Sequence, residues 1–309
     1  MGDGTRLLIV SPVRNEAAHI ELVAHSAAGQ SRPPDLWLVV DDGSTDGTLE
    51  LLRQLSTGIP FMRPLSTPRG YTRDAGDRHA VAAAPRAFNW ALRTVDWRSF
   101  THIGKLDGDI ELPDDYFARL LAEFDRDPAL GIGGGILVER TGSHWRPMRT
   151  APHHVRGALK LYRRECFDAI GGVQERLGWD GLDQSYARMR GYRTRSFEDI
   201  VARHHRAVGT ADGSLRGRRR GGETQYVLGF SFLWAAMKAL KCCLSRPPVL
   251  SGAAFMYGYL RASSRGSVSR IDDPEYMRFV RRDERRRLRR ALLRRDRPGV
   301  GGPAPRSSS

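Results

Sequence analysis

The sequence predicts a layered α/β domain with a largely parallel sheet, followed by a basic helical extension. Apolar runs of strand length alternate with helical patterns through the first half of the 309 residues. Such alternation is typical of parallel sheets covered by helices. Hydrophobic residues make up 40% of the chain, enough for a sizeable core. The formal net charge of +15 is a third feature, and it points to an anionic partner.

The first half contains the elements of the predicted sheet and its covering helices. Apolar runs predict strands at residues 6–11, 36–40, 59–65 and 101–106. Helical periodicity predicts helices at residues 15–28, 46–55, 79–95 and 114–124. Asn15 is the candidate N-cap of the first helix, and Ser44 or Thr45 of the second. In this layout ligands bind beyond the carboxyl ends of the strands.

The second half has a mixed pattern of strands and helices. Strands are expected at residues 131–139, 155–162 and 192–197, and helices at 165–170 and 181–190. The stretch at 211–223 is rich in Gly and Arg and is expected to be a loop. It contains Arg-Gly-Arg-Arg-Arg-Gly-Gly, which could close over a substrate diphosphate.

Three segments follow from these patterns. The α/β domain is expected at residues 1–224. Two apolar helices, at 225–244 and 250–260, predict a helical hairpin at residues 225–262. An Arg-rich helix and a disordered tail are expected at residues 263–309, because the last stretch is rich in Pro, Gly and Ser.

Two carboxylates, Asp107 and Asp109, follow the predicted strand at residues 101–106. Alternation along an extended chain places them on one face, and Gly108 leaves room for the backbone between them. Paired carboxylate oxygens at the end of a strand suit Mg²⁺ or Mn²⁺, which would also hold a substrate diphosphate. Asp-Gly-Asp is also common turn chemistry, so an acidic turn is the alternative.

Arginine is concentrated near the end of the chain. Residues 276–297 contain eleven Arg against three acidic residues, a net charge of +8. This cluster suits an anionic partner such as phospholipid headgroups or nucleic acid, and it is equally compatible with a solvated helix. Aromatic and basic residues are not interleaved as they are in nucleic-acid-binding modules, so no nucleic acid is expected as a partner.

The compartment is inferred from cysteine usage and from the apolar segments. Cys166, Cys242 and Cys243 form neither a metal-ligand spacing nor a disulfide framework, which favours a reducing compartment. No signal peptide is expected before the first strand, and no apolar run has the length of a membrane span. The hairpin at 225–262 lies either in a membrane interface or as a cap on the core. We expect a cytoplasmic protein that is peripheral at the inner face of the cell membrane.

Four motifs occur in a recognisable order. They are Val-Ser-Pro-Val-Arg-Asn-Glu at residues 10–16, Val-Val-Asp-Asp-Gly-Ser-Thr-Asp at 39–46, Lys-Leu-Asp-Gly-Asp at 105–109, and the segment from Gly-Trp-Asp-Gly-Leu-Asp to Arg-Gly-Tyr at 178–192. In order and spacing, residues 5–210 resemble the family 2 glycosyltransferases of the GT-A fold, of the inverting, non-processive type. The Gln-x-x-Arg-Trp motif of processive polysaccharide synthases is absent from the sequence, which favours transfer of a single sugar.

The resemblance assigns nucleotide binding to the loops at the strand ends. An Asp of the second loop would accept a hydrogen bond from the base, and uracil and guanine fit equally well. The first loop would contact base and ribose, and a basic segment before residue 79 would approach the phosphates. The residues implied are Pro12, Arg14, Glu16, Asp41, Asp42, Arg73, Arg78 and Asp107.

The resemblance also implies a divalent metal, Mn²⁺ or Mg²⁺, held by Asp107 and Asp109. A late histidine often completes the metal shell in this fold. The adjacent His204 and His205 would point in different directions, so at most one of them should bind, and we expect His205.

The catalytic base of the family removes the proton from the acceptor hydroxyl. Relatives carry a Glu-Asp pair at the start of the corresponding helix, whereas this chain has Trp-Asp-Gly-Leu-Asp. We expect Asp183 to be the base, with Asp180 as the alternative that would otherwise cap the helix or touch the donor sugar. Trp179 is a candidate stacking surface for a sugar ring, or else part of the core.

The predicted function is that of an inverting, metal-dependent glycosyltransferase of the hexosyltransferase type. It would move one sugar from a nucleotide-diphosphate sugar, UDP-linked by default, to a hydroxyl of a glycan or lipid-linked acceptor. Its partners would include an anionic membrane surface, and its role would be in surface polysaccharide assembly.

Two other functions remain as alternatives. The first is a nucleic-acid-binding protein that uses the Arg-rich tail. The second is a nucleotidyltransferase of similar layout, which is disfavoured because Ser-Pro-Val-Arg-Asn-Glu at residues 11–16 occupies the place of a Gly-rich, Lys-containing phosphate loop.

Overall fold

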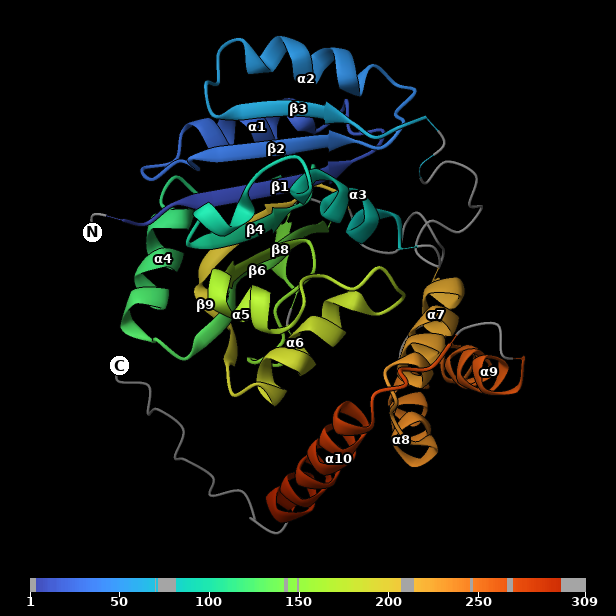
Figure 1. The fold of residues 1–309 in the computed structure, drawn as a ribbon. Coiled ribbons are helices and arrows are strands. Elements are labelled where there is room, and N and C mark those ends of the chain that lie inside the picture. Colours follow the sequence, from blue (N-terminus) through green and yellow to red (C-terminus); the bar gives the residue numbers. More distant parts are fainter. Residues whose placement is uncertain are drawn as a thin grey trace, which may run out of the picture. The chain divides into compact units, whose positions relative to one another are not determined.

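Four parallel strands form one half of the sheet, in the order β3-β2-β1-β4 (Figure 1). The computed structural model describes residues 4–69, 71, 82–141, 144–148, 150–206, 214–244, 247–265 and 269–295. The strands are β1 (Leu7–Val13), β2 (Leu36–Asp41), β3 (Met62–Ser66) and β4 (His102–Leu106). The helices that follow them are α1 (Ile20–Ala28), α2 (Thr48–Ser56), α3 (Ala83–Leu92) and α4 (Tyr116–Arg126). The 3₁₀ helix η1 (Trp97–Ser99) precedes β4.

The other half of the sheet is mixed. β8 (Leu159–Arg163) pairs antiparallel with β4, and β6 (Leu130–Thr141) pairs antiparallel with β8 and parallel with β9 (Arg193–His204). The helices here are α5 (Arg164–Ala169) and α6 (Trp179–Met189), and β7 (His144–Pro147) pairs with β6. The short strand β5 (Ile110–Glu111) pairs with the end of β9, with Ile110 opposite His204. This pairing brings the acidic segment after β4 to the end of β9.

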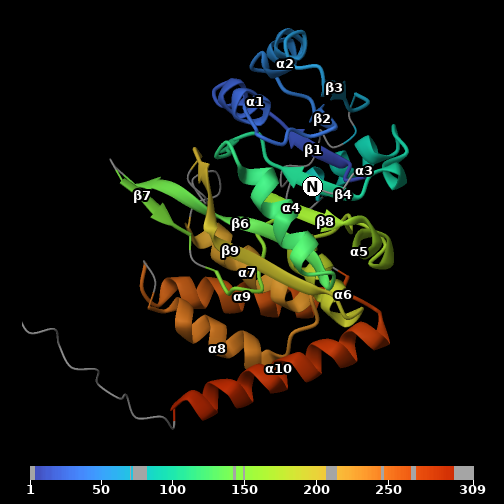
Figure 2. The same ribbon diagram turned by 90° about the vertical axis from the view of Figure 1, so that its left-hand side faces the viewer.

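Apolar side chains cover both faces of the parallel strands. Odd-numbered residues such as Ile9 and Trp37 belong to one buried cluster, and even-numbered residues such as Val10 and Leu38 belong to a second. Because strands in parallel sheets are buried on both faces, they read as continuous apolar runs, and this is why the sequence shows them clearly. Figure 2 shows α4 lying across β6 and β9 on the first of these faces.

Asn15 is not the N-cap of the first helix, as the sequence predicted. α1 begins at Ile20, and Asn15 has a left-handed backbone with φ of 55°. Its side-chain Oδ1 accepts a hydrogen bond from the Thr45 backbone N–H at 2.9 Å, and its own N–H donates to Ser44 Oγ at 2.9 Å. Asn15 therefore joins the loops that follow β1 and β2 and holds them next to each other.

The chain divides into two compact units, Met1–Gly217 and Arg218–Ser309. The division falls within α7 (Ser214–Val227), where the sequence predicted a loop that could close over a diphosphate. That prediction is wrong for residues 214–223, which are helical. The glycines serve close packing instead: a Cβ at Gly222 would collide with the Phe255 carbonyl, and one at Gly258 with the Arg219 carbonyl. Glycine in a helix lowers its propensity, and this packing offsets that cost.

The second unit also contains α8 (Phe232–Cys242), α9 (Leu250–Arg265) and α10 (Pro274–Arg295). The prediction of a single helix at 225–244 is wrong. Gly229, with φ of 79°, follows the end of α7, and Ser231 caps α8 by accepting a hydrogen bond from the Trp234 N–H. α8 and α9 pack together through a cluster of buried apolar residues, Ala235, Ala239, Phe255 and Tyr259. The tail predicted to be disordered, 298–309, lies outside the described residues.

In the described part of the chain, none of the helices combines the length and the apolar character that crossing a bilayer requires.

A buried histidine gives the fold a pH dependence. His102 on β4 is 4% exposed and lies opposite Arg163 across the β4–β8 pair. Burial, aided by the charge of Arg163, lowers the pKa of His102 to about 4 from an ordinary 6.5. The folded state therefore holds the ring neutral. The stability that depends on a neutral His102 is fully present above pH 6.5. It is lost as the pH falls from 6.5 toward 4, because the unfolded chain binds the proton first.

Replacing His102 with Phe should reduce the loss of stability in acid. Phe keeps an aromatic ring against Phe124 but cannot be protonated. We expect the free energy of unfolding of the natural protein to fall between pH 7 and pH 5 by about 2 kcal/mol more than that of the variant. Urea unfolding at the two pH values measures this difference. Equal losses in the two proteins would contradict the assignment to His102.

Candidate active site

The carboxyl ends of β1, β2 and β4 meet at one edge of the sheet, and the acidic pair lies there. Asp107 and Asp109 follow β4 directly, and the loop after β1 packs against the glycine between them. A Cβ at Gly108 would lie 2.7 Å from Val13 Cγ1 and 3.1 Å from Glu16 Cγ. Glycine at this position thus allows the loop after β1 to approach the acidic pair.

Asp109 has a histidine neighbour, and it is His204 at the end of β9. His204 Nε2 lies 3.3 Å from Asp109 Oδ2, and its Nδ1 lies 3.2 Å from Glu139 Oε1. Burial acts to raise the pKa of Asp109, but the hydrogen bond and charge of His204 outweigh it, and the pKa lies below its ordinary value. The two carboxylates raise the pKa of His204 despite its burial. Asp109 is therefore held as a carboxylate.

The predicted metal ligand His205 points elsewhere. Its Nε2 lies 2.8 Å from Glu111 Oε2, and its ring lies 5.4 Å from the Trp145 ring. Only its backbone N–H reaches the acidic pair, where it donates to the Asp109 carbonyl at 3.0 Å. Of the two adjacent histidines, the structure brings the imidazole of His204, and not that of His205, to the acidic pair.

Glu16 and Arg206 complete the surroundings of Asp109. Arg206 Nη2 lies 2.6 Å from Glu16 Oε2, and its Nε lies 3.9 Å from Asp109 Oδ2. Burial, together with the charge of Asp109, raises the pKa of Glu16 to about 8, although Arg206 opposes the shift. Glu16, a predicted nucleotide-binding residue, thus lies beside the acidic pair. Arg206 was not predicted, although it directly follows the two histidines in the sequence.

The loop after β2 is tightly bound to itself. Asp41 accepts hydrogen bonds from the backbone N–H groups of Gly43 and Ser44, each at 3.2 Å. Asp42 accepts from the Thr67 hydroxyl at 3.0 Å. Both residues are buried. These hydrogen bonds are those of a turn, as the sequence suggests, and they do not prevent either carboxylate from also contacting a base.

The other predicted nucleotide-binding residues fall into two groups. Pro12 lies in β1 opposite Val40. Arg14 is half-buried, and its Nη1 is buried without a hydrogen-bond partner among the described residues. Such a donor at the sheet edge is suited to an anionic ligand. Arg73 and Arg78 lie outside the described residues.

The two candidate bases have different environments at the start of α6. Asp180 is half-buried in the first turn, whereas the Asp183 side chain is fully buried. Asp183 accepts hydrogen bonds from Lys160 Nζ at 2.7 Å and from the Tyr162 hydroxyl. Burial raises the pKa of Asp183, with Lys160 opposing the shift. The carboxylate nevertheless has no exposed surface on which an acceptor hydroxyl could approach.

Two buried lysines connect α6 to the acidic pair. Lys105 on β4 lies directly opposite Lys160 on β8, and each is 2% exposed. Lys105 forms an ion pair with Asp107, and Lys160 forms one with Asp183. The Trp179 ring is common to both, with its centroid 5.4 Å from Lys105 Nζ and 5.1 Å from Lys160 Nζ. Trp179 is therefore a cation-binding surface inside the domain.

Lys160 also fixes the backbone of the first turn of α6. Its Nζ donates to the Asp180 carbonyl at 2.6 Å. Lys105, Lys160 and Tyr162 were not predicted as site residues. The only signal was the presence of lysine in runs that were predicted to be buried strands.

The chemistry of the acidic pair fits a hard divalent cation. Two carboxylates and an imidazole are ligands that Mn²⁺ and Mg²⁺ accept. Among the described residues, however, no group of three or more His, Cys, Asp and Glu side chains is arranged so that it could hold a metal ion. Asp107, Asp109 and His204 would thus need ligand atoms from a substrate, or a change of side-chain position.

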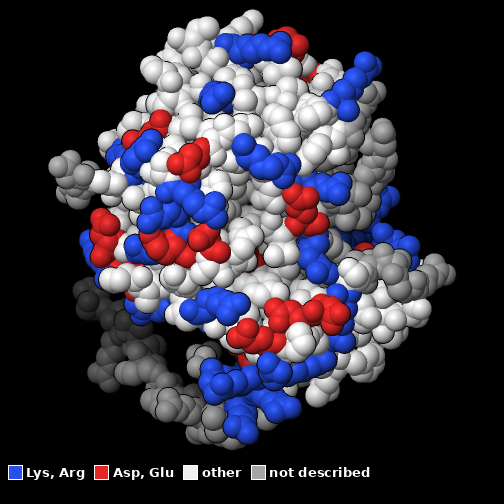
Figure 3. All heavy atoms as spheres, viewed as in Figure 1, with Lys and Arg blue, Asp and Glu red and all other residues white. Residues whose placement is uncertain are grey.

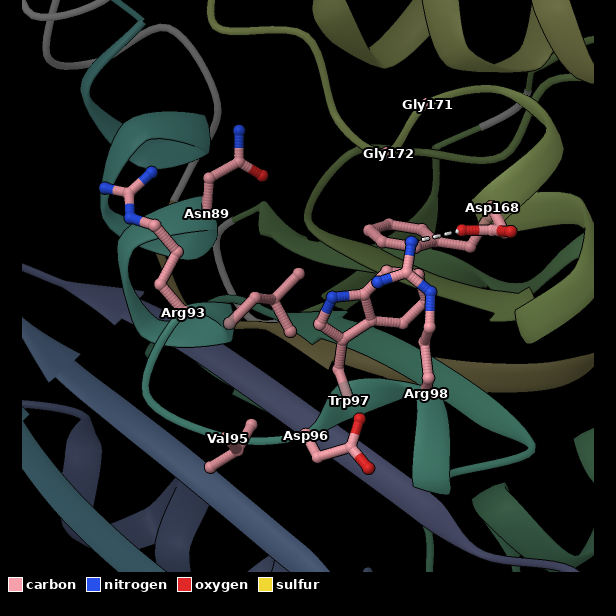
Figure 4. A pocket seen from close by; sticks show the side chains of 11 residues that line it. Asn89, Arg93, Val95, Asp96, Trp97, Arg98, Asp168, Gly171 and Gly172 are labelled. Atoms are coloured by element: carbon pink, nitrogen blue, oxygen red, sulfur yellow. Dashed lines mark hydrogen bonds and ion pairs between the residues drawn. The ribbon is translucent and has the colours of Figure 1, made fainter.

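A separate pocket of about 570 Å³ lies at the other end of the strands. Asn89 of α3 and Arg93, the residue that follows α3, line one side, and Arg98 and Asp168, 2.8 Å apart, line the other (Figure 4). It borders η1, before β4, whereas the acidic pair follows β4. The Arg98 guanidinium lies over the Trp97 ring at 4.3 Å, so that ring face is already covered. This pocket is not part of the candidate active site.

A comparison with protein families decides the identity of the domain. The model for Glycosyl transferase family 2 matches residues 8–200, which is more than half of the chain. The chain belongs to glycosyl transferase family 2. The predictions of the family, of the α/β GT-A fold with a helical extension and of a transferase enzyme are confirmed.

Three known proteins illustrate the likeness. The chain is 30% identical over 200 residues to the succinoglycan biosynthesis protein ExoA of Rhizobium meliloti, covering 55% of this chain and 54% of ExoA. It is 26% identical over 185 residues to a polyprenol monophosphomannose synthase of Mycolicibacterium smegmatis, covering 53% of this chain and 64% of the synthase. It thus spans less than two thirds of these relatives. The mannosyltransferase PcManGT of Pyrobaculum calidifontis, solved with GDP-Man and Mn²⁺, shares the fold with a TM-score of 0.54 and 19% identity, covering 94% of this chain and 79% of that one.

The Lys160–Asp183 pair should be essential to stability. Lys160→Met leaves the Asp183 carboxylate buried without its cation, and we expect a loss of about 3–5 kcal/mol in the free energy of unfolding. The double variant Lys160→Met/Asp183→Asn removes both charges and keeps an acceptor for the Tyr162 hydroxyl. It should recover most of the loss in urea unfolding. A double variant no more stable than Lys160→Met would show that an unpaired buried charge is not the cause.

Proposed function

We propose that this glycosyltransferase moves a single sugar from a nucleotide-diphosphate sugar to a hydroxyl of a glycan or lipid-linked acceptor. The observation that supports it best is the convergence of Asp107, Asp109, Glu16 and Arg14 at the carboxyl edge of the sheet, beside the first turn of α6. Acidic residues with the ligand chemistry for a metal, the buried Nη1 of Arg14 without a partner among the described residues, and the half-buried carboxylate of Asp180 are the groups that such a transfer uses.

The donor would bind across the loops that follow β1 and β2. Asn15 links these loops through Ser44 and Thr45, so a nucleotide would meet a preformed surface. Arg14 would pair with a phosphate oxygen, because its Nη1 is a buried donor without a described partner. Asp41 or Asp42 would accept from the base. UDP is our default for the nucleotide, and GDP is the alternative that the ligand of PcManGT supports.

We propose Asp180 as the base, in preference to Asp183. The half-buried Asp180 carboxylate can take the proton of the acceptor hydroxyl as that oxygen bonds to the anomeric carbon. The bond from that carbon to the diphosphate oxygen breaks, and its electron pair leaves with the nucleoside diphosphate, inverting the configuration. Asp183 would instead hold Lys160, which fixes the Asp180 backbone.

We further propose Mn²⁺ or Mg²⁺ as cofactor, with Asp107, Asp109 and His204 as its ligands from the chain. His204 replaces the predicted His205, because its Nε2 lies 3.3 Å from Asp109 whereas His205 faces Glu111. When bound, the metal would offset the charge that develops on the departing diphosphate. Arg206 and Arg14 would add positive charge to the same region.

The relatives suggest where this activity is used. One is named for succinoglycan biosynthesis and the other for polyprenol monophosphomannose synthesis. We propose a role in the assembly of a surface polysaccharide or a lipid-linked glycan, at the inner face of the cell membrane. A lipid-linked acceptor would reach the enzyme at a membrane, so peripheral attachment to an anionic lipid surface is part of this proposal.

A thermal-shift screen tests donor and metal binding. We expect UDP or GDP to raise the melting temperature in the presence of Mn²⁺, and CDP and TDP to have less effect. Asp109→Asn should remove the part of the shift that depends on Mn²⁺, because it removes a ligand charge. Asp125→Asn, an exposed site on α4, is the matched control and should behave like the natural protein. If no nucleotide shifts the transition with Mn²⁺ present, the proposed donor site is wrong.

Hydrolysis of the donor, with water as acceptor, tests the base. Asp180→Asn should keep the nucleotide shift but lower the rate of nucleoside diphosphate release by about 100-fold or more, because a general base contributes that much. Asp183→Asn should affect mainly stability. A variant Asp180→Asn with undiminished turnover would exclude Asp180 as the base.

A further inference from the structure

The second unit exposes large apolar side chains that its own core does not use. On α8 and just beyond its end, four large apolar residues recur at helical spacing: Leu233, Met237 and Leu240 of the helix and Leu244 after it, which are 62%, 38%, 72% and 89% exposed. The opposite side of the helix, at Ala235 and Ala239, packs against α9. α8 is therefore apolar on two sides, one buried and one exposed.

α9 repeats this arrangement. Phe255 and Tyr259 belong to the shared core, whereas Leu250, Tyr257 and Leu260 are 57%, 55% and 50% exposed. The connection between the helices continues the apolar surface, because Val249 is 67% exposed. The exposed faces of α8 and α9 and the end of the hairpin thus carry one set of large apolar side chains. An apolar area of this kind marks an interaction surface.

The charges around this surface identify the partner. Between residues 224 and 271 the sequence contains six Lys or Arg and no Asp or Glu. Lys241, in the last turn of α8, is exposed and lies in the sequence between Leu240 and Leu244. Apolar side chains flanked by cations, without any carboxylate, match the boundary between the acyl chains and the phosphate groups of an anionic bilayer.

The Arg-rich helix α10 adds positive charge to the same unit. Tyr276, Val280 and Glu284 form its buried side, and Glu284 accepts from the Ser231 N–H at 2.6 Å, at the start of α8. The arginines on its other sides are therefore exposed, among them Arg278, Arg282, Arg285, Arg286 and Arg289. Figure 3 shows Lys and Arg side chains gathered along α10, with Asp and Glu side chains beside them, while the area over α8 and α9 is largely uncharged.

We propose that the α8–α9 hairpin lies in the surface of an anionic phospholipid bilayer. Leu233, Leu240, Leu244 and Tyr257 enter the acyl boundary, and Lys241 pairs with lipid phosphates. This inference rests on the membrane placement in the proposed function and assigns it to named residues. The hairpin serves as an in-plane anchor, which agrees with the absence of a bilayer-crossing helix among the described residues.

Vesicle sedimentation of the full chain tests the anchor. The natural protein should sediment with vesicles of phosphatidylcholine and phosphatidylglycerol and far less with phosphatidylcholine alone. Leu240→Glu/Leu244→Glu should lower the partition coefficient about 100-fold, because two apolar side chains leave the membrane and two negative charges are added. Tyr257→Glu/Leu260→Glu, on α9, should give a similar decrease. Leu22→Glu, at a 40% exposed leucine of α1, is the matched control and should bind like the natural protein.

Three results would overturn the proposal. They are equal binding to the two vesicle types, unchanged binding of both double variants, and a natural dimer in size-exclusion chromatography that binds no vesicles and becomes monomeric in the double variants. The last would show that a second copy covers the surface. The thermal shift with UDP or GDP and Mn²⁺, measured on the same samples, separates the two proposals. A retained shift without vesicle binding contradicts the anchor alone, and vesicle binding without any shift contradicts the donor site alone.

Discussion

Two buried lysines that face each other across the sheet constrain the whole candidate active site. Lys105 and Lys160 are cross-strand neighbours in β4 and β8, an arrangement that repulsion and desolvation would normally forbid. Each is neutralised by its own carboxylate, Asp107 or Asp183, and the Trp179 ring lies near both. The three segments that hold these groups, the end of β4, the strand β8 and the first turn of α6, are therefore fixed together. The residues proposed to bind the metal and the proposed base are therefore positioned by the same two lysine–carboxylate ion pairs.

In the same region three carboxylates lie close to one another, each beside a basic side chain. Asp107 forms an ion pair with Lys105, and Asp109 lies beside His204 and Arg206. Glu16 lies next to Asp109, and its burial, together with the negative charge of Asp109, raises its pKa to about 8. A divalent cation at the pair would compete with Lys105 and Arg206 for the same oxygens. The affinity for the proposed cation would thus depend on the positions of these two side chains.

The features that could be predicted from the sequence are those that depend on local pattern and on the order of motifs. Strands buried on both faces appear as apolar runs, so the placement of Asp107 and Asp109 beyond β4 could be predicted. The choice between His204 and His205 could not, because it depends on the register of β5 against β9, and one residue of slip exchanges the two faces. For the same reason the opposition of Lys105 and Lys160 was invisible: it needs the antiparallel register of a strand more than fifty residues away in the chain.

The helices after residue 213 show the opposite limit, where local pattern misleads. Glycines such as Gly222 suggested a loop, but they let the backbones of α7 and α9 approach until no side chain fits between them. Gly252 does the same for α8 and α9, because a Cβ at this position would lie 2.6 Å from the Ala239 carbonyl. Contacts between backbones leave no side-chain rotamers to adjust. The helix backbones that carry the exposed apolar side chains are consequently held in place before any partner arrives, and association would cost little backbone conformational entropy.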